Sequence, residues 1–343
     1  MSITRPTVIV LGAGASCEYR FPLGTALLKQ VKDALTYEFQ FSQPLKGSHD
    51  VFHTLTEMFP EFRNGDNKRV NDYLKAAGTL SKVLEFNKHA SIDEAIHLFA
   101  GQSEVIEVGK LAIAASIRSA EVRCLEKGSP FGSYDASKIV GWMADLFSIA
   151  IGSLSKGQIR EAFKNVTIIN FNYDRSFEHF IYHALQALGI EADEAAETTR
   201  SISILRPYGS LGDLKPLHAS GVQFGHGVGS LQPLAKNIKT YTEQNHDPAL
   251  IARAKKALTN ATTVMFLGFG FHKQNLDILQ VEGSTNSKTI FATAKDIDRE
   301  NHGAIAERLF LLLRPSNRQI CIENLTCSEM FARRRQMIDL AVN

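Results

Sequence analysis

The stretch that decides the fold stands near the amino terminus and reads Val8-Ile9-Val10-Leu11-Gly12-Ala13-Gly14-Ala15-Ser16. Its four consecutive apolar residues are typical of a strand buried on both faces, as in a parallel sheet. The glycines and alanines that follow predict a tight turn into a helix, and such a turn lets the backbone approach a phosphate group. We therefore expect a nucleotide-binding strand-turn-helix unit to open the chain.

This turn departs from the G-x-G-x-x-G fingerprint of dehydrogenases in two respects. Cys17 occupies the place of the third glycine. No strand ending in Asp or Glu follows about 20 residues later, where those enzymes place the acid that binds the ribose. The turn alone leaves two interpretations open, a phosphate-binding loop and a packing feature.

Further β-branched runs recur between segments of helical periodicity, which is typical of a parallel sheet covered by helices on both faces. We expect six strands, at residues 8–11, 166–171, 202–205, 263–267, 289–292 and 319–322. The predicted fold class is α/β, with a Rossmann-like doubly wound parallel sheet and an inserted helical subdomain.

Helix signals stand between these strands. Residues 177–188 carry apolar side chains at a spacing of 3.6 and stop at Gly189. Asp247 followed by Pro248 predicts another helix start, and residues 328–342 also read as helix. We expect a solvated acidic loop at 191–197 and an irregular glycine-rich stretch at 220–233, which is either a mobile flap or a long loop.

About 155 residues with almost no strand signal separate the first two strands, far more than one crossover needs. We assign residues 31–159 to the inserted helical subdomain, and residues 1–30 and 160–343 to the Rossmann domain. The clearest element of the insert is the capping box Ser91-Ile92-Asp93-Glu94, which predicts a helix that continues to about Ala100.

Composition narrows the class of protein. The 343 residues are 44% hydrophobic and 22% charged, as in an ordinary globular protein. A formal net charge of +2 gives no reason to expect nucleic acid or membrane as a partner. The four cysteines form no C-x-x-C pair, and no apolar run approaches the ~18 residues that span a bilayer, so we expect a cytoplasmic protein.

Two histidine pairs with a spacing of four, His49/His53 and His179/His183, lack the glutamate of H-E-x-x-H and a third ligand. We interpret them as ordinary helix residues and expect no metal site. No Walker lysine follows a glycine-rich loop, so nucleoside triphosphate hydrolysis is not expected.

Short motifs follow four of the predicted strands. They are Gly12 to Ser16 with Phe21-Pro22-Leu23-Gly24, Phe171-Asn172-Tyr173-Asp174, Tyr208-Gly209-Ser210-Leu211-Gly212, and Leu267-Gly268-Phe269-Gly270-Phe271-His272 with Asn275-Leu276. Together they resemble the sirtuin superfamily, specifically the zinc-free branch found among bacterial anti-phage NAD hydrolases. The resemblance covers residues 7–30 and 166–295, and it reaches the insert only loosely, through Ser91-Ile92-Asp93.

The resemblance implies that NAD is the substrate or ligand and that no metal takes part. It assigns the pyrophosphate to Gly12, Ala13, Gly14, Ala15 and Ser16, and the wall beside the nicotinamide ribose to Pro22 and Gly24. It assigns the adenosine side to Gly268, Phe269 and Gly270, closed by Asn275 and Leu276.

The resemblance also implies catalytic roles. Asn172 would contact the nicotinamide ribose or orient a water molecule, and Asp174 would lie near the carboxamide or brace the loop. The alternative is a strand-end turn in which Asp174 caps the next helix, and the two roles can coexist.

The third motif departs from the family, whose enzymes usually carry histidine where Tyr208 stands. A phenol with a pKa of about 10 is a poor base at neutral pH, and losing a general base typically forfeits about 10²- to 10⁴-fold in rate. Nicotinamide, however, leaves as a neutral molecule and needs no proton donor. Tyr208 could hydrogen-bond a ribose hydroxyl, while His218 and His226 are either backup bases or loop residues without a role.

The expected function is that of an NAD glycohydrolase effector that cleaves the nicotinamide-ribose bond and depletes NAD in bacterial anti-phage defence. The resemblance implies a homo-oligomer and a companion such as an ATPase or an Argonaute-like protein. Tyr208 favours the alternative, a non-catalytic NAD or ADP-ribose binding subunit of a defence or regulatory complex. Lysine deacylation is disfavoured, because the cysteine-bound zinc module of that branch is missing.

Overall fold

The computed structural model describes residues 2–41, 43–86, 91–129, 131, 140–227, 229–240 and 247–343. Its centre is a parallel sheet of six strands in the order β10-β9-β8-β1-β4-β5. The strands are β1 (Thr7–Leu11), β4 (Val166–Asn170), β5 (Ser203–Leu205), β8 (Thr263–Leu267), β9 (Thr289–Thr293) and β10 (Gln319–Glu323). The six predicted strands and the predicted fold class are confirmed.

The chain starts in the middle of the sheet, fills one side through β4 and β5, and then returns to fill the other side through β8, β9 and β10. Strand order reverses between β1 and β8, as in a Rossmann-like doubly wound fold. Leu11 pairs with both Asn170 and Leu267, so β1, β4 and β8 end level with one another. Ligands of such folds bind outside the strand ends at the reversal.

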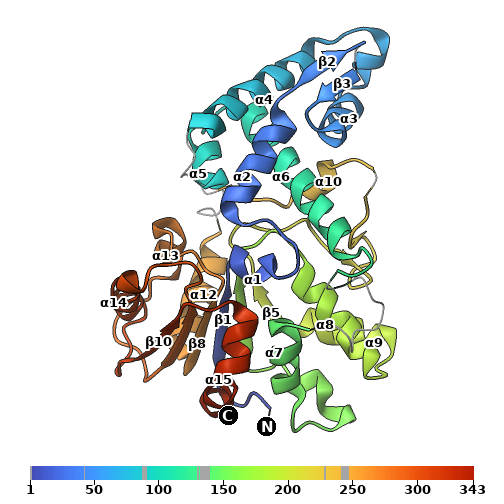
Figure 1. Ribbon diagram of the computed structural model, residues 1–343. Coiled ribbons are helices and arrows are strands. Elements are labelled where there is room, and N and C mark those ends of the chain that lie inside the picture. The colour runs from blue at the N-terminus through green and yellow to red at the C-terminus, as the bar shows by residue number, and fades with distance from the viewer. Residues whose placement is uncertain are drawn as a thin grey trace.

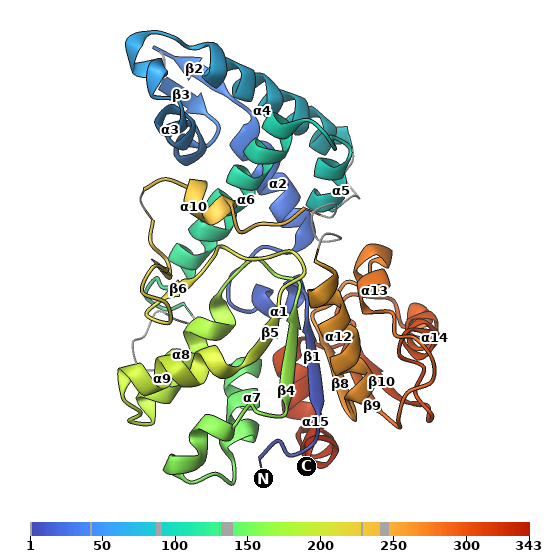
Figure 2. The ribbon, with the colours of Figure 1, turned by 180° about the vertical axis from the view of Figure 1, so that it is seen from behind.

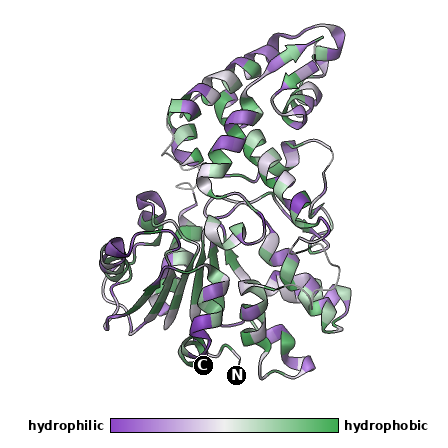
Figure 3. Ribbon diagram, viewed as in Figure 1, coloured by the Kyte–Doolittle hydropathy of each residue, from purple (hydrophilic) through white to green (hydrophobic). Residues whose placement is uncertain are grey.

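Helices cover both faces of the sheet, with α7 (Trp142–Ile151) and α15 (Cys327–Val342) on one face and α12 (Pro248–Asn260) on the other (Figures 1 and 2). β1 and β8 are buried along their whole length, as central parallel strands are. Figure 3 accordingly shows hydrophobic residues concentrated in the sheet. The other helices that accompany the sheet are α1 (Ala13–Cys17), η3 (Lys156–Glu161), α8 (Ser176–Ala187), α9 (Ala192–Ser201), α13 (Lys273–Leu279), η4 (Arg299–Asn301) and α14 (His302–Leu313).

Local helix signals are confirmed where capping residues define them. Gly189, with φ 74°, follows the end of α8, and the Asp247 side chain accepts the Leu250 backbone N–H at the start of α12. The prediction of a solvated acidic loop at 191–197 is wrong, because these residues begin α9. Acidic side chains stabilise the first turn of a helix, because they face the positive end of its dipole. In α9 they are followed by alanines and threonines that are buried, and the helix packs against α8.

Most residues between β1 and β4 build a helical layer above the carboxyl edge of the sheet (Figure 1). It contains α2 (Gly24–Leu35), β2 (Glu38–Gln40), β3 (Gln43–Lys46), α3 (His49–Met58), η1 (Pro60–Asn64), α4 (Lys68–Phe86), α5 (Ile92–His97) and α6 (Ser103–Cys124). The capping box at Ser91 is confirmed, although α5 ends before Ala100. The hairpin β2–β3 was not predicted, because its mostly exposed strands show no apolar alternation.

The helical layer and the predicted insert differ in extent. α7 lies within residues 31–159, but it packs against α15 and α8 beside the sheet. α2 begins before residue 31, and the short helix α10 (Gln232–Ala235) packs against α6 from a segment that we assigned to the Rossmann domain. Periodicity identifies a helix, but it does not say which layer the helix joins.

A buried ion pair joins the two layers. Arg175, at the start of α8, donates hydrogen bonds of 3.0 and 2.7 Å to the two carboxylate oxygens of Glu121 on α6. The exposed fractions of these side chains are 2% and 0%. Arg175 also donates to the carbonyls of Asp213 and Val222, and the Gly225 N–H donates to Glu121. One ion pair therefore holds α6, α8 and the glycine-rich stretch together.

The glycine-rich stretch at 220–233 carries β7 (Val222–Gln223), which pairs with β6 (Leu214–Lys215). Arg118 on α6 donates to the Gly229 carbonyl at 2.8 Å, and the Leu231 N–H donates to Thr54 on α3 at 3.0 Å. Its described part is thus a long loop fastened to the helical layer.

Candidate functional site

A cavity of about 650 Å³ lies between the carboxyl edge of the sheet and the helical layer. Pockets that hold a small molecule or cofactor typically measure about 300–1,000 Å³. Its walls come from the turns after β1, β4, β5, β8 and β9, from the start of α15, and from α2, α5 and α6. The four sequence motifs thus meet at one cavity, at the point where strand order reverses.

Most of the predicted site residues line this cavity. They are Gly12, Ala13, Gly14, Ser16, Pro22, Gly24, Asn172, Asp174, Tyr208, Gly268, Phe269, Gly270 and Asn275. Ala15 and Leu276 lie behind the wall, and the buried carbonyl of Ala15 accepts a hydrogen bond of 2.8 Å from Trp142 Nε1.

The structure does not bring His218 to the cavity. It is exposed in the turn that follows β6, outside the set of residues that line the cavity. His226 also lies outside that set. Closeness to Tyr208 in the sequence was the only reason to consider either histidine, and the fold places neither of them in the cavity wall.

The glycines of the first and fourth motifs pack backbone to backbone. The Gly14 N–H donates to the Gly268 carbonyl at 2.9 Å, and the Gly12 N–H donates to the Leu267 carbonyl at 3.0 Å. Gly268 has φ +59°, and a Cβ placed on it would lie 1.9 Å from the Ala15 nitrogen. These glycines are therefore needed for close packing of the two turns. Because they have no side chains, only backbone faces the cavity at Gly12, Gly14 and Gly268.

We expect Gly268→Ala to destabilise the protein by about 1–3 kcal/mol, because the added methyl group meets backbone at a positive φ. Urea denaturation measures this change in the free energy of unfolding. Gly78→Ala is the control: Gly78 lies inside α4 with no atom within 4 Å of the added Cβ, so alanine there should stabilise by about 0.5–1 kcal/mol. Equal midpoints for the two variants would contradict the proposed contact.

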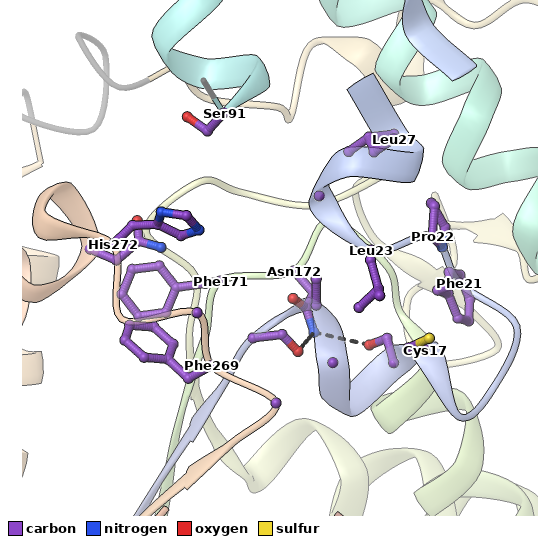
Figure 4. A pocket seen from close by; sticks show the side chains of 18 of the residues that line it. Cys17, Phe21, Pro22, Leu23, Leu27, Ser91, Phe171, Asn172, Phe269 and His272 are labelled. Atoms are coloured by element: carbon purple, nitrogen blue, oxygen red, sulfur yellow. Dashed lines mark hydrogen bonds between the residues drawn. The ribbon is translucent and has the colours of Figure 1, made fainter. Parts of the chain in front are cut away.

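The two polar atoms of the Asn172 side-chain amide differ in their hydrogen bonds. Its Nδ2 donates hydrogen bonds of 2.9 Å to the Gly12 carbonyl and to Ser16 Oγ, which bind the second motif to the first. Its Oδ1 accepts no hydrogen bond from the described residues and points into the cavity (Figure 4). The side chain is therefore fixed by its nitrogen and presents an oriented acceptor to a ligand.

Asp174 caps the helix that follows it. Its Oδ1 accepts the Ser176 backbone N–H at 3.0 Å and also the Ser176 hydroxyl. Arg206, which we did not predict, donates at 2.9 Å to the Asn172 carbonyl and at 3.0 Å to the Asp174 carbonyl. The same guanidinium holds Glu178 on α8. The Asn172–Asp174 turn is thus braced from both sides.

Tyr208 connects the third motif to the fourth. Its hydroxyl donates a hydrogen bond of 2.8 Å to Asn275 Oδ1. Its ring packs with the rings of Phe171 and Tyr173, with centroid distances of 5.9 and 6.5 Å. Since the phenolic proton is directed at Asn275, Tyr208 positions the wall of the cavity and is not arranged as a base.

Asp93 is the functional candidate that we did not single out from the sequence. It lines the cavity from α5, and its Oδ1 accepts a hydrogen bond of 2.6 Å from the Tyr173 hydroxyl. Burial raises the pKa of Asp93 to about 6, although the Tyr173 hydrogen bond opposes that rise. Carboxyl groups with pKa values raised toward neutrality are typical of functional sites. The only sequence signal was the Ser91-Ile92-Asp93 stretch.

The other ionisable side chains of the cavity wall have structural partners or are exposed to solvent. Glu18 accepts the backbone N–H groups of Cys327 and Ser328 and so caps α15. Burial and Glu18 raise the pKa of the Cys17 thiol, which disfavours its nucleophilic form. No group of three His, Cys, Asp or Glu side chains among the described residues could hold a metal ion.

No helix in the described part of the chain is both long and apolar enough to cross a membrane. No protein-family model matches the sequence, and no curated protein matches it.

Proposed function

We propose that this protein binds NAD in the cavity and hydrolyses the bond between nicotinamide and ribose. One observation carries the proposal. Four motif turns meet where the strand order reverses, and there Asn172 presents an oriented amide oxygen to a cavity of dinucleotide size. Open α/β sheets bind dinucleotides at this place.

In the proposed complex the pyrophosphate lies over the glycine turns at Gly12, Gly14 and Gly268. The adenosine extends toward Gly270 and Asn275, and the nicotinamide ribose lies between Asn172 and the opposite wall formed by α2 and α5. The rings of Phe171 and Phe269, whose centroids are 5.3 Å apart, supply an apolar surface beside this path (Figure 4). An apolar wall excludes water and strengthens the electrostatic contacts made inside.

The proposed reaction does not need a general acid to protonate the leaving group. When the glycosidic bond breaks, its electron pair enters the cationic pyridinium ring, so nicotinamide leaves as a neutral molecule. Positive charge develops on the ribose, where the negative end of the Asn172 amide dipole stabilises it. The same oxygen accepts a hydrogen bond from a ribose hydroxyl or from the attacking water, and so orients the reacting groups.

The resemblance to anti-phage NAD hydrolases also supports a proposal about the biological role of the protein. We propose a cytoplasmic, homo-oligomeric effector of bacterial defence that depletes NAD when a companion protein, such as an ATPase or an Argonaute-like protein, activates it. Purification of the tagged protein from its host tests this extension, since a stable companion would co-purify and an oligomer would elute above 37.9 kDa.

Incubation of the purified protein with NAD, with nicotinamide and ADP-ribose quantified over time, tests the reaction. We expect equal amounts of both products. The second candidate, a non-catalytic NAD or ADP-ribose binding subunit, is favoured by Tyr208, which is buried and donates to Asn275 at 2.8 Å. Both candidates predict thermal stabilisation by NAD, but only the hydrolase predicts nicotinamide. Stabilisation without release, even with partner proteins present, would establish the second.

A further inference from the structure

The proposed hydrolysis leaves one chemical requirement unmet, because the attacking water must lose a proton and Tyr208 is not placed to take it. We propose that Asp93, contributed by the helical layer, is the general base of this site. This inference rests on the proposed NAD hydrolysis and adds the group that activates its water.

The position of Asp93 is set by local and long-range contacts. The capping box of Ser91 and Glu94 fixes the start of α5, and Asp93 is the second residue of that helix. Ser91, Ile92, Asp93 and Glu94 all line the cavity. Figure 4 shows Ser91 across the cavity from Asn172, so α5 forms the wall that faces the amide oxygen.

The Tyr173 hydroxyl orients the carboxyl group. It engages Oδ1 of Asp93 at 2.6 Å, and no other side chain of the described residues donates to either oxygen. Oδ2 is therefore available to a water molecule. Because Tyr173 directly follows Asn172, one turn positions both the amide oxygen and the carboxylate.

The other carboxyl groups of the cavity wall are less suited to this role. Glu94 accepts the Ser91 N–H, Asp174 caps α8 and Glu18 caps α15. Asp296 lies in the turn after β9 with 85% of its side chain exposed, beside Lys295. Asp174 uses one oxygen to cap α8 and lies on the same turn as Asn172, whereas Asp93 lies on α5, whose Ser91 stands across the cavity from Asn172.

The reaction balances with Asp93 as base. The water oxygen forms a bond to the ribose C1′ while the bond from C1′ to the nicotinamide nitrogen breaks and its electron pair passes to the ring. One water proton passes to Asp93 Oδ2. The products are ADP-ribose and neutral nicotinamide, and the proton is then released to solvent.

The proposal predicts a pH profile. Burial raises the pKa of Asp93, the Tyr173 hydroxyl and the Asp93 backbone N–H lower it, and Glu94 on the same helix raises it. The described charged groups of α2, α4 and α6, which pack against α5, contribute no shift. With a pKa of about 6, the active carboxylate is lost as the pH falls below that value. We expect kcat/KM to fall about tenfold per pH unit below pH 6 and to be constant above about pH 7.

Asp93→Asn tests the role directly. The amide keeps an acceptor for Tyr173 and nearly the same volume, but it cannot take a proton. We expect kcat at pH 8 to fall about 10²-fold, KM for NAD to change little and the acidic limb of the profile to disappear. Tyr173→Phe removes the hydrogen bond that lowers the Asp93 pKa, so its acidic limb should move to higher pH.

Asp193→Asn is the matched control, because Asp193 is likewise the second residue of a helix, α9, but it is exposed and does not line the cavity. We expect wild-type rates and an unchanged profile. If Asp93→Asn kept the wild-type profile while the wild type released nicotinamide, Asp93 would not be the base and the hydrolase would stand. A wild type that released no nicotinamide would overturn both.

Calorimetry with ADP-ribose gives a readout that is independent of turnover. At pH 6, a ligand beside Asp93 perturbs its protonation, so the binding enthalpy of the wild type should depend on the ionisation enthalpy of the buffer. Asp93→Asn should lose that dependence. A wild-type enthalpy that was the same in all buffers would place Asp93 away from the ligand and overturn the proposal.

Discussion

Asn172→Ala is expected to lower nicotinamide release by about 10³-fold or more, because it removes the oriented acceptor from the proposed reaction centre. It also removes both Nδ2 hydrogen bonds, to Gly12 and to Ser16. The rate loss should appear in kcat, while ADP-ribose still stabilises the variant against heat. Product quantification and thermal unfolding with and without ADP-ribose measure the two effects.

Asn165→Ala is the matched control for this variant. Asn165 immediately precedes β4, at the opposite end of that strand from Asn172, and its Nδ2 likewise donates two hydrogen bonds, to the carbonyls of Ile3 at 3.2 Å and Thr4 at 2.9 Å. Its replacement should cost stability of the same order and leave the rate unchanged. If Asn172→Ala kept the wild-type rate, the assignment of the reaction centre would be wrong even with NAD hydrolysis intact.

Glu121→Ala is expected to lower the free energy of unfolding by about 3–5 kcal/mol, the largest change in stability that we predict. The substitution leaves the Arg175 guanidinium buried without its carboxylate, and an unpaired buried charge is strongly destabilising. Burial raises the pKa of Glu121 and Arg175 opposes that rise, so the carboxylate depends on this partner. Urea denaturation at pH 7 measures the loss.

Two comparisons separate the buried pair from a general effect of losing a carboxylate. Glu307→Ala breaks an ion pair with Arg318 in which both side chains are at least half exposed, and it should change stability little. The double variant Glu121→Met/Arg175→Met should be more stable than Glu121→Ala, because no charge remains buried. A double variant less stable than either single variant would refute this account.

The same ion pair bears on the site, because Arg175 lies next to Asp174 and Glu121 lies on a helix of the upper layer. Loss of the pair should loosen the contact between the layers that form the cavity. We therefore expect Glu121→Ala also to weaken the thermal stabilisation produced by ADP-ribose.

Much of the fold could be predicted from the sequence. Strands at the centre of a parallel sheet are buried on both faces, so 263–267 is apolar enough to be recognised without any knowledge of its neighbours. Capping residues such as Asp247 are equally local, since they act on backbone groups three residues away. For the same reason, the motifs at the strand ends could be assigned to one edge of the sheet before their contacts were known.

Local patterns misled us where the packing partner was distant. The acidic residues at 191–197 looked like a loop, because the helix they begin is buried against α8 through small side chains. His218 looked close to Tyr208, but the chain between them leads to an exposed turn. α7 looked like part of the insert, because periodicity is the same in either layer.

By itself, the sequence determined the strands, the capped helices and the convergence of four motifs on one edge, because hydrophobic periodicity and capping act over a few residues. Only the tertiary structure decided that Asp93 meets Tyr173 and that Glu121 meets Arg175, contacts between residues 80 and 54 positions apart. Such contacts depend on how the helical layer docks on the sheet. Docking is set by the combined packing of many side chains, which no short segment encodes.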